Sequence, residues 1–316
     1  MGRGPHQSAL LTLRPAPGDV PVISFRTHVV TLVAVFLALA VGVVLGGGPL
    51  SEVGRGTEDA EALRADASQA RSEAEFGQSF ADDVSATLLG SRLSDREVAV
   101  VTLPGADAKV VEGLTERIAA AGGKVTVTQS IGSSLVNEGE KSLVDTLGSQ
   151  LMAQLPDGAV TDGASTYERA GELIGFSLAN SGEKSVASTP QSTAVAEGLR
   201  GANLLDAADD PSGRAPLVLV VLGDEVTGDG ADAILGGLLT GMASQARGLV
   251  VAAPTADEGQ QLDRLREDDG LGDATSVDGA ETAAGQVAAV VALARSYDTQ
   301  GGSFGAGGAD GTVPLG

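Results

Sequence analysis

The sequence predicts an α/β protein in which an N-terminal transmembrane helix and a coiled-coil helix precede a domain built on a parallel sheet. Three observations predict this fold class. An uncharged, mostly apolar segment of 20 residues runs from Val29 to Gly48, and small residues then recur in heptads. From residue 97 onward, short apolar runs alternate with helical patterns. These features divide the 316 residues into an anchor, a stalk and a body.

The anchor is assigned to residues 23–48. A helix of 20 residues rises about 30 Å, which matches the hydrocarbon core of a membrane. Arg26 precedes the apolar run and acidic residues follow it, so the positive-inside rule places the N-terminus in the cytoplasm and exports the rest. Arg26 and His28 then form the cytoplasmic edge of the anchor. A cleavable secretory signal is the alternative, since Gly46, Gly47 and Gly48 offer small residues near a cleavage site.

One face of this helix carries small residues at every fourth position. Small side chains let two membrane helices approach closely, which favours a homo-oligomer. The alternative is that Ala and Gly are simply common in this chain. The packing positions are Ala34, Ala38, Gly42 and Gly46.

Residues 1–22 fit neither a signal peptide nor a domain. We expect them to be a disordered extension or the product of a mis-assigned start.

The stalk is assigned to residues 51–92. Small or apolar residues recur there at alternating spacings of three and four, which is the seam of a coiled coil. Because the seam is mostly Ala, it buries little area, but a shared membrane raises the local concentration of two copies. A solvent-facing single helix is the alternative. The seam positions are Ala60, Leu63, Ala67, Ala70, Ala74, Gly77, Ala81, Val84 and Leu88.

The body is assigned to residues 97–297. Strands are expected at 97–103, 124–128, 217–223, 248–254 and, as a short edge strand, 274–277. Helical patterns lie between them, at 107–121, 138–155, 165–179, 192–205, 229–246, 257–267 and 281–297. Strands that alternate with helices predict a parallel sheet covered on both faces, a Rossmann- or flavodoxin-like domain. The Gly-rich residues 298–316 are expected to be a disordered tail.

Composition and motifs exclude several function classes. The net charge of −22 repels nucleic acid and anionic surfaces. Neither GxGxxG nor GxxxxGK[ST] occurs, so no nucleotide cofactor is expected. His6 and His28 are the two histidines and both precede the exported part, so no Ser-His-Asp triad forms there. We therefore predict a protein that is not an enzyme and has no cofactor.

An acidic loop, "GDEVTGDGAD", follows the buried strand at 217–223, where α/β folds place ligands. Its carboxylates would suit a hard cation, although the spacing matches no EF-hand. Helix capping and solvation explain them equally well. The candidate metal ligands are Asp224, Glu225, Asp229 and Asp232. Soft copper ligands in the body reduce to Met152 and Met242, and Met is usually core filling.

The stretch "VISFRTHVVTLVAVFLALAVGVVLGGGPLS" resembles the N-terminal signature of the actinobacterial MctB-like family of copper transport proteins of the cell envelope. The motif residues here are Ile23, Ser24, Arg26 and His28. The resemblance continues through "VAVVTLPGAD" and "SVDGAETAAGQVAAVVALA". It implies a role in copper homeostasis that limits intracellular copper, with copper ions as the transported species and a possible place in the outer envelope.

A second function class stays open from the residues themselves. The exported body on its stalk also fits a non-enzymatic interaction or scaffold protein of the envelope, with a membrane-bound protein partner. For such a protein, the resemblance to related proteins implies a role in cell separation.

Overall fold

The computed structural model describes residues 49–208, 212–228, 230–255, 260–268 and 270–315, and their side chains from residue 63 onward. The predicted anchor at 23–48, with Ala34, Ala38, Gly42 and Gly46, lies outside these residues, as do residues 1–22. The described chain divides at Arg71 into two units, of which the second, residues 72–316, holds the α/β body. In the described part of the chain, no helix is long and apolar enough to cross a membrane.

The predicted α/β class is confirmed by six parallel strands in the order β2-β1-β3-β4-β5-β6. The first five follow the order 2-1-3-4-5 that flavodoxin-like sheets share. The strands are β1 (Glu97–Thr102), β2 (Lys124–Ser130), β3 (Leu217–Val221), β4 (Gly248–Ala252), β5 (Thr275–Val277) and β6 (Ser303–Phe304).

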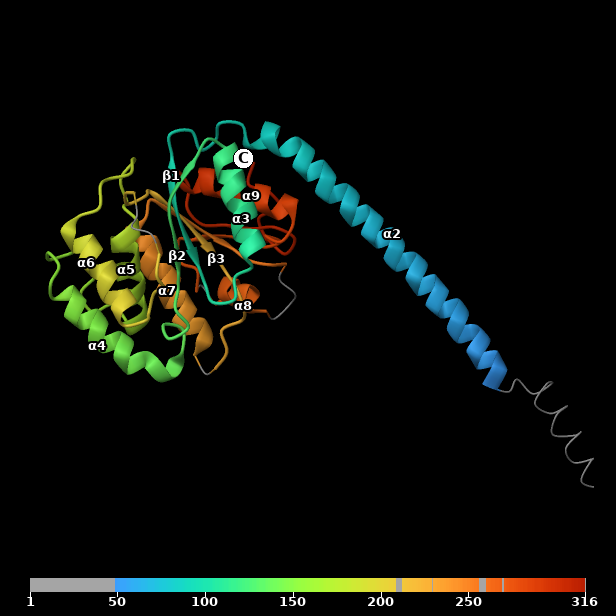
Figure 1. The fold of residues 1–316 in the computed structure, drawn as a ribbon, viewed down its shortest axis with the longest axis horizontal. Helices are drawn as coiled ribbons and strands as arrows, with labels where there is room; N and C mark the ends of the chain where they lie inside the picture. Colours follow the sequence, from blue (N-terminus) through green and yellow to red (C-terminus); the bar gives the residue numbers. More distant parts are fainter. Residues whose placement is uncertain (1–48, 209–211, 229, 256–259, 269, 316) are drawn as a thin grey trace, which may run out of the picture. The chain divides into compact units, whose positions relative to one another are not determined.

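Helices connect these strands and cover the sheet on both faces (Figure 1). They are α2 (Pro49–Leu89), α3 (Ala108–Ala120), the 3-10 turn η1 (Glu138–Glu140), α4 (Lys141–Met152), α5 (Thr166–Leu178), α6 (Pro190–Gly201), α7 (Ala231–Gln245), α8 (Gln261–Glu267) and α9 (Ala283–Ser296). Each predicted helix of the body has a counterpart, with ends displaced by a few residues.

Two hydrophobic cores lie on the two faces of the sheet, because successive strand residues point to opposite sides. In β1, Val98 and Val100 enter one core, while Ala99 and Val101 enter the other. The first core lies under α3, α9 and the end of α2, and the second lies under α4, α5, α6 and α7, as Figure 1 shows.

Glycine lets α5 and α7 pack backbone to backbone in the second core. A Cβ on Gly171 of α5 would lie 2.2 Å from the carbonyl oxygen of Leu238, and one on Gly241 of α7 would lie 2.1 Å from that of Glu168. This close approach of the two helices explains part of the high glycine content, 45 residues of 316.

The end of α2 belongs to the body. Ala81, Ser85 and Leu89 are buried on one face of its last turns, at spacings of four. Leu89 is fully buried among α3, α9 and the sheet, which contributes about 2 kcal/mol. The stalk at 51–92 is therefore helical to Leu89, but its last turns pack on the body. Pairing with a second helix stays a prediction.

The tail is ordered, contrary to the prediction for residues 298–316. Ser303–Phe304 forms β6, which pairs with β5 in parallel, and Phe304 is 5% exposed. The predicted edge strand at 274–277 is therefore an inner strand. The reason is a set of long-range contacts: Arg266 of α8 donates to the carbonyl oxygen of Phe304 at 2.9 Å, and Asp278 accepts from the N–H of Gly307 at 2.9 Å.

Candidate functional site

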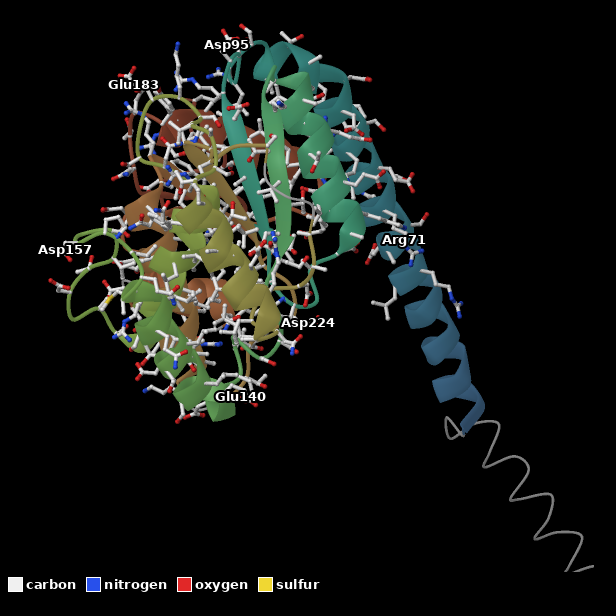
Figure 2. All side chains as sticks on the ribbon, turned by 60° about the vertical axis from the view of Figure 1, so that its left-hand side comes forward. Arg71, Asp95, Glu140, Asp157, Glu183 and Asp224 are labelled. Atoms are coloured by element: carbon white, nitrogen blue, oxygen red, sulfur yellow. The ribbon has the colours of Figure 1, made fainter. Side chains whose placement is uncertain are left out.

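The carboxyl ends of β1 and β3 form the position where this fold places ligands. The helix after β1, α3, lies on one face of the sheet, and the helix after β3, α7, lies on the other. Neighbouring strands whose connections leave on opposite faces create a crevice at their carboxyl ends, which is the usual site in α/β proteins. In Figure 2, Asp224 marks this edge.

In this protein the two loops fill that crevice themselves. The N–H of Asp224 donates to the carbonyl oxygen of Pro104 at 3.0 Å. A Cβ on Gly223 would lie 2.1 Å from the same oxygen, and Gly105 has a φ of +79° with the Asp224 carboxyl against it. Because the loops touch at the backbone, a nucleotide-sized ligand does not fit between them.

Two cavities remain beside this contact. One, of about 210 Å³, lies between the β3 and β4 loops and the start of α8, against Leu222, Pro254 and Gln261. The other, of about 310 Å³, lies against Pro104, Asn137 and Asp224. Pockets for small molecules usually hold about 300–1,000 Å³, so the second is just large enough for a small ligand and the first is not.

The acidic loop is organised by an arginine that the sequence pattern did not single out. Arg264 of α8 donates through Nε to Asp232 at 2.7 Å and through Nη2 to Glu225 at 2.9 Å. The hydrogen bond from Arg264, aided by its charge, holds the pKa of Asp232 below its ordinary value. The bonds to Asp232 and Glu225 together raise the pKa of Arg264. Asp232 also lies in the first turn of α7, where negative charge favours the helix.

Arg264 therefore lies where a cation between Glu225 and Asp232 would lie. Asp224 contacts Gly105 instead of joining this pair. Asp229, the fourth predicted ligand, is outside the described residues. Across the ranges that the structure describes, no group of three or more His, Cys, Asp or Glu side chains is arranged to hold a metal ion. Arg264 was missed because its separation from Asp232 in sequence, 32 residues, leaves no local signal.

The two methionines of the body fill the core, as the sequence suggested. Met242 of α7 is 1% exposed, and Met152 of α4 packs against the same core. His6 and His28, like Arg26, lie outside the described residues. The described body thus presents no cluster of soft ligands for copper.

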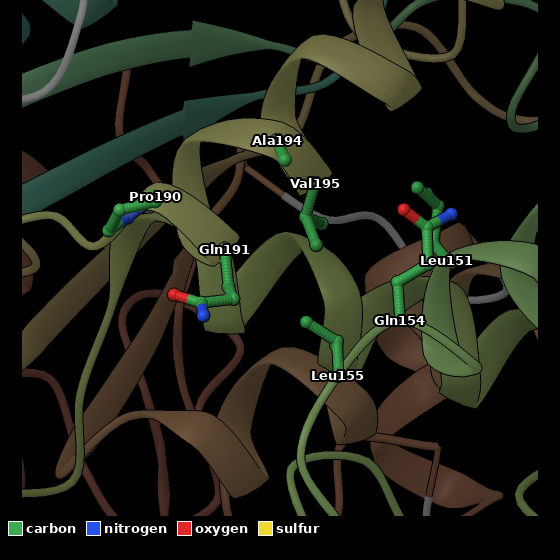
Figure 3. Close-up of a pocket in the computed structure, with 7 residues that line it drawn as sticks. All are labelled: Leu151, Gln154, Leu155, Pro190, Gln191, Ala194 and Val195. Atoms are coloured by element: carbon green, nitrogen blue, oxygen red, sulfur yellow. The ribbon is translucent and has the colours of Figure 1, made fainter.

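A further cavity of about 190 Å³ lies between the end of α4 and the start of α6 (Figure 3). Leu151, Leu155 and Val195 line it with apolar side chains, and Gln154 and Gln191 add amide groups. Its lining contains no charged or nucleophilic side chain. The cavity therefore suits the binding of a small apolar group and offers no group for catalysis. No sequence motif marked it.

Comparison with known proteins gives two findings. The family model described as "Copper transport outer membrane protein, MctB" matches residues 22–314. Proteins named "Copper transporter MctB" from Mycobacterium bovis and Mycobacterium tuberculosis are each 32% identical to this chain over 160 residues. The matched region covers 43% of this chain and 49% of each relative, so the chain spans about half the length of the curated relatives it matches.

Proposed function

Because the chain belongs to the family of the copper transport outer membrane protein MctB, we propose that it acts in copper homeostasis at the cell envelope and limits intracellular copper. The observation that carries this proposal is the extent of the family match, which runs from residue 22 to residue 314. The relatives named as copper transporters support the same substrate.

The proposed arrangement in the envelope is a single-pass protein. Residues 23–48 are the membrane anchor, the N-terminus with Arg26 and His28 is cytoplasmic, and the α/β body is exported. The charge change across the apolar run supports this topology. The start of the family match at residue 22 supports a functional unit that includes this segment.

The body is proposed to influence copper through contacts with other proteins, without a copper site of its own. Cu(I) favours thiolate and thioether ligands, the sequence has no Cys, and Met242 is enclosed in the core. The carboxylates of the acidic loop are hard ligands, and two of them pair with Arg264.

Deletion of the gene tests the copper role. We expect cells without the protein to hold more copper under copper stress than the parent, as measured by mass spectrometry of washed cells. Complementation with the full chain should restore the parental content. Unchanged copper content in the deletion strain would contradict the proposal.

A second candidate function, an envelope scaffold, is favoured by one observation on α2. Phe76 and Phe80 are 74% and 58% exposed, and their rings stack with centroids 6.3 Å apart. Exposed aromatic pairs are typical of interaction surfaces. Phe76→Ser/Phe80→Ser should release a co-purifying envelope protein, whereas Ser79→Ala should not. The copper content of the deletion strain separates the two candidates, because loss of a scaffold alone leaves it unchanged. Tight binding of Cu(I) by the purified chain would contradict the indirect role that both candidates share.

A further inference from the structure

Arginines gather at the amino-terminal edge of the sheet. Arg96 comes one residue before β1, Arg214 three residues before β3 and Arg247 one residue before β4. Since these three strands are parallel neighbours, their amino ends meet at one edge. Figure 2 shows this edge, marked by Asp95 and Glu183, at the end of the body away from Asp224. The chain as a whole carries 20 Lys and Arg against 42 Asp and Glu, so a local excess of arginine is unusual.

Two of these arginines share one aromatic ring. The Cζ atom of Arg96 lies 3.1 Å from the ring centroid of Tyr297, and that of Arg247 lies 4.1 Å from it. Arg247 is fixed there, because its Nε donates to the carbonyl oxygen of Tyr297 at 2.8 Å. Tyr297 is fixed in turn, because its hydroxyl donates to the carbonyl oxygen of Glu183 at 2.9 Å.

The guanidinium groups at this edge are incompletely paired within the described residues. Arg96 forms no ion pair with the described residues, and its Nη1 is buried without a hydrogen bond. The Nε of Arg214 is also buried without one. Arg247 has Asp298 at 3.8 Å, but that carboxylate is 76% exposed. Both guanidinium groups lie against the Tyr297 ring, so an anion bound beside that ring would offset their charge.

A polar cavity opens beside the shared ring. It holds about 350 Å³, within the usual range for small ligands. Arg247 and Tyr297 line it together with Ser181, Ala246, Gln300 and the carboxylate-bearing Asp298. The guanidinium of Arg247, the hydroxyl of Ser181 and the amide of Gln300 supply hydrogen-bond donors, which suit an acceptor-rich ligand.

We propose that this cavity, here named the Tyr297 pocket, binds a phosphate-type oxyanion. The planar guanidinium of Arg247 donates two parallel hydrogen bonds to such a group, and a doubly charged anion also offsets the charge of Arg96 on the same ring. Asp298, weakly held and exposed, turns outward when the anion enters. This proposal is independent of the copper proposal, and the outcome of one does not decide the other.

The wild-type chain tests whether the site exists. The full chain, in a non-ionic detergent, is titrated with inorganic phosphate by calorimetry at constant ionic strength, with chloride as the reference salt. We expect saturable binding and a rise in melting temperature. Heat that grows linearly without saturation, with no rise beyond that given by chloride, overturns the proposal.

Two substitutions test whether the phosphate binds in the Tyr297 pocket. Arg247→Gln should weaken phosphate binding by about 10- to 100-fold, the loss of one charge-assisted pair, and Arg96→Gln, outside the cavity lining, should weaken it by a smaller factor. Arg71→Gln, at an exposed position on α2, is the matched control and should bind like wild type. If a Gln variant does not fold, Arg247→Lys keeps the charge but loses the two-pronged donor and should still weaken binding. Folded variants that bind like wild type overturn the assignment.

Soluble lipids distinguish a lipid headgroup from free phosphate as the natural ligand. A free phosphate and a lipid phosphomonoester present the same group, so dihexanoyl phosphatidic acid is compared with inorganic phosphate. Tighter binding of the lipid identifies a headgroup, and tighter binding of the inorganic ion identifies free phosphate; both support the site. Dihexanoyl phosphatidylcholine, whose phosphate is a singly charged diester, should bind much more weakly. Equal binding of all three overturns recognition of the oxyanion charge.

Discussion

Gln78 of α2 accepts a hydrogen bond from the backbone N–H of Ala283, the first residue of α9, across 2.6 Å. The first N–H groups of a helix have no partner within it, so Gln78 satisfies one of them from 205 residues away. Nearby, Asp82 forms an ion pair with Arg117 of α3. These contacts, with buried Ala81, Ser85 and Leu89, make the last turns of α2 part of the body.

Removal of the Gln78 side chain is expected to weaken the contact between the last turns of α2 and the start of α9. Gln78→Ala leaves the Ala283 N–H without its acceptor, which should cost about 1 kcal/mol of unfolding free energy. Hydrogen exchange should quicken at the start of α9 and in the last turns of α2. Ser79→Ala, an exposed neighbour, is the control. Equal rates of hydrogen exchange in both variants would argue against a stabilising contact between Gln78 and α9.

Loss of the buried ion pair at the end of β5 should lower the free energy of unfolding far more than loss of the Gln78 side chain. Arg266 and Asp278 are 3.0 Å apart, with side chains 8% and 0% exposed. Asp278→Asn leaves a buried guanidinium without its counter-charge, which should cost about 3–5 kcal/mol. Proteolysis should then reach the tail that Arg266 holds.

Glu97→Gln is the matched control for that substitution. It removes a partially exposed partner 3.8 Å from Lys124, and such pairs contribute about 0–1 kcal/mol. If Asp278→Asn costs no more than Glu97→Gln, the ion pair does not hold the tail.

The closed crevice between the β1 and β3 loops predicts a strong effect at Gly223. Gly223→Ala places a methyl group against the Pro104 oxygen and should cost about 3 kcal/mol. In contrast, a Cβ on Gly201, the last residue of α6, meets nothing within 4 Å. Gly201→Ala should stabilise the protein by up to about 1 kcal/mol. Denaturant unfolding measures both, and a mild effect at Gly223 would mean that the crevice can open.

The contact between Arg264 and Asp232 predicts a pH dependence. The folded pKa of Asp232 lies below its ordinary value of 3.8, so its carboxylate stabilises the fold at neutral pH. That contribution is lost as pH falls below 3.8 toward the folded pKa. The difference in unfolding free energy between wild type and Asp232→Asn should therefore shrink below this pH. A constant difference would contradict it, and solvent screening keeps the effect modest.

The coiled coil is testable because the chain contains no Cys. A parallel pair of stalks brings equal seam positions together, so Ala67→Cys and Ala74→Cys should form disulfide-linked dimers in membranes. Ser68→Cys, beside the seam, should not. Ala81→Cys should also fail, because that seam position is 8% exposed and packs on the body. Equal cross-linking at all four positions would indicate random collision.

Local patterns were sufficient for the class of the fold. Val98, Val100 and their neighbours formed a buried run, and so did Leu217 to Val221, because strands of a covered parallel sheet are apolar on both faces. Helix starts were less exact: the helix predicted from residue 192 begins at Pro190, after the capping Thr189, a signal that the prediction did not use. Periodicity of this kind needs only residues a few positions apart.

The candidate site was less predictable. Asp224, Glu225 and Asp232 were placed correctly at the carboxyl edge of the sheet, but their partners were not known. Arg264 reaches Asp232 only because α8 folds back beside α7. The same holds for Arg96 and Arg247, which meet over Tyr297 from strands and a helix far apart in sequence.

The sequence by itself determined the alternation of strands and helices, the acidity, the missing thiols and the family resemblance, all of which are properties of composition and short-range spacing. Only the tertiary structure decided that the Gly-rich tail adds a sixth strand, that α2 ends against the body, and which charges meet. The physical reason is that ion pairs and buried contacts depend on distances in space, and the chain brings residues such as Gln78 and Ala283 together only when the whole domain has folded.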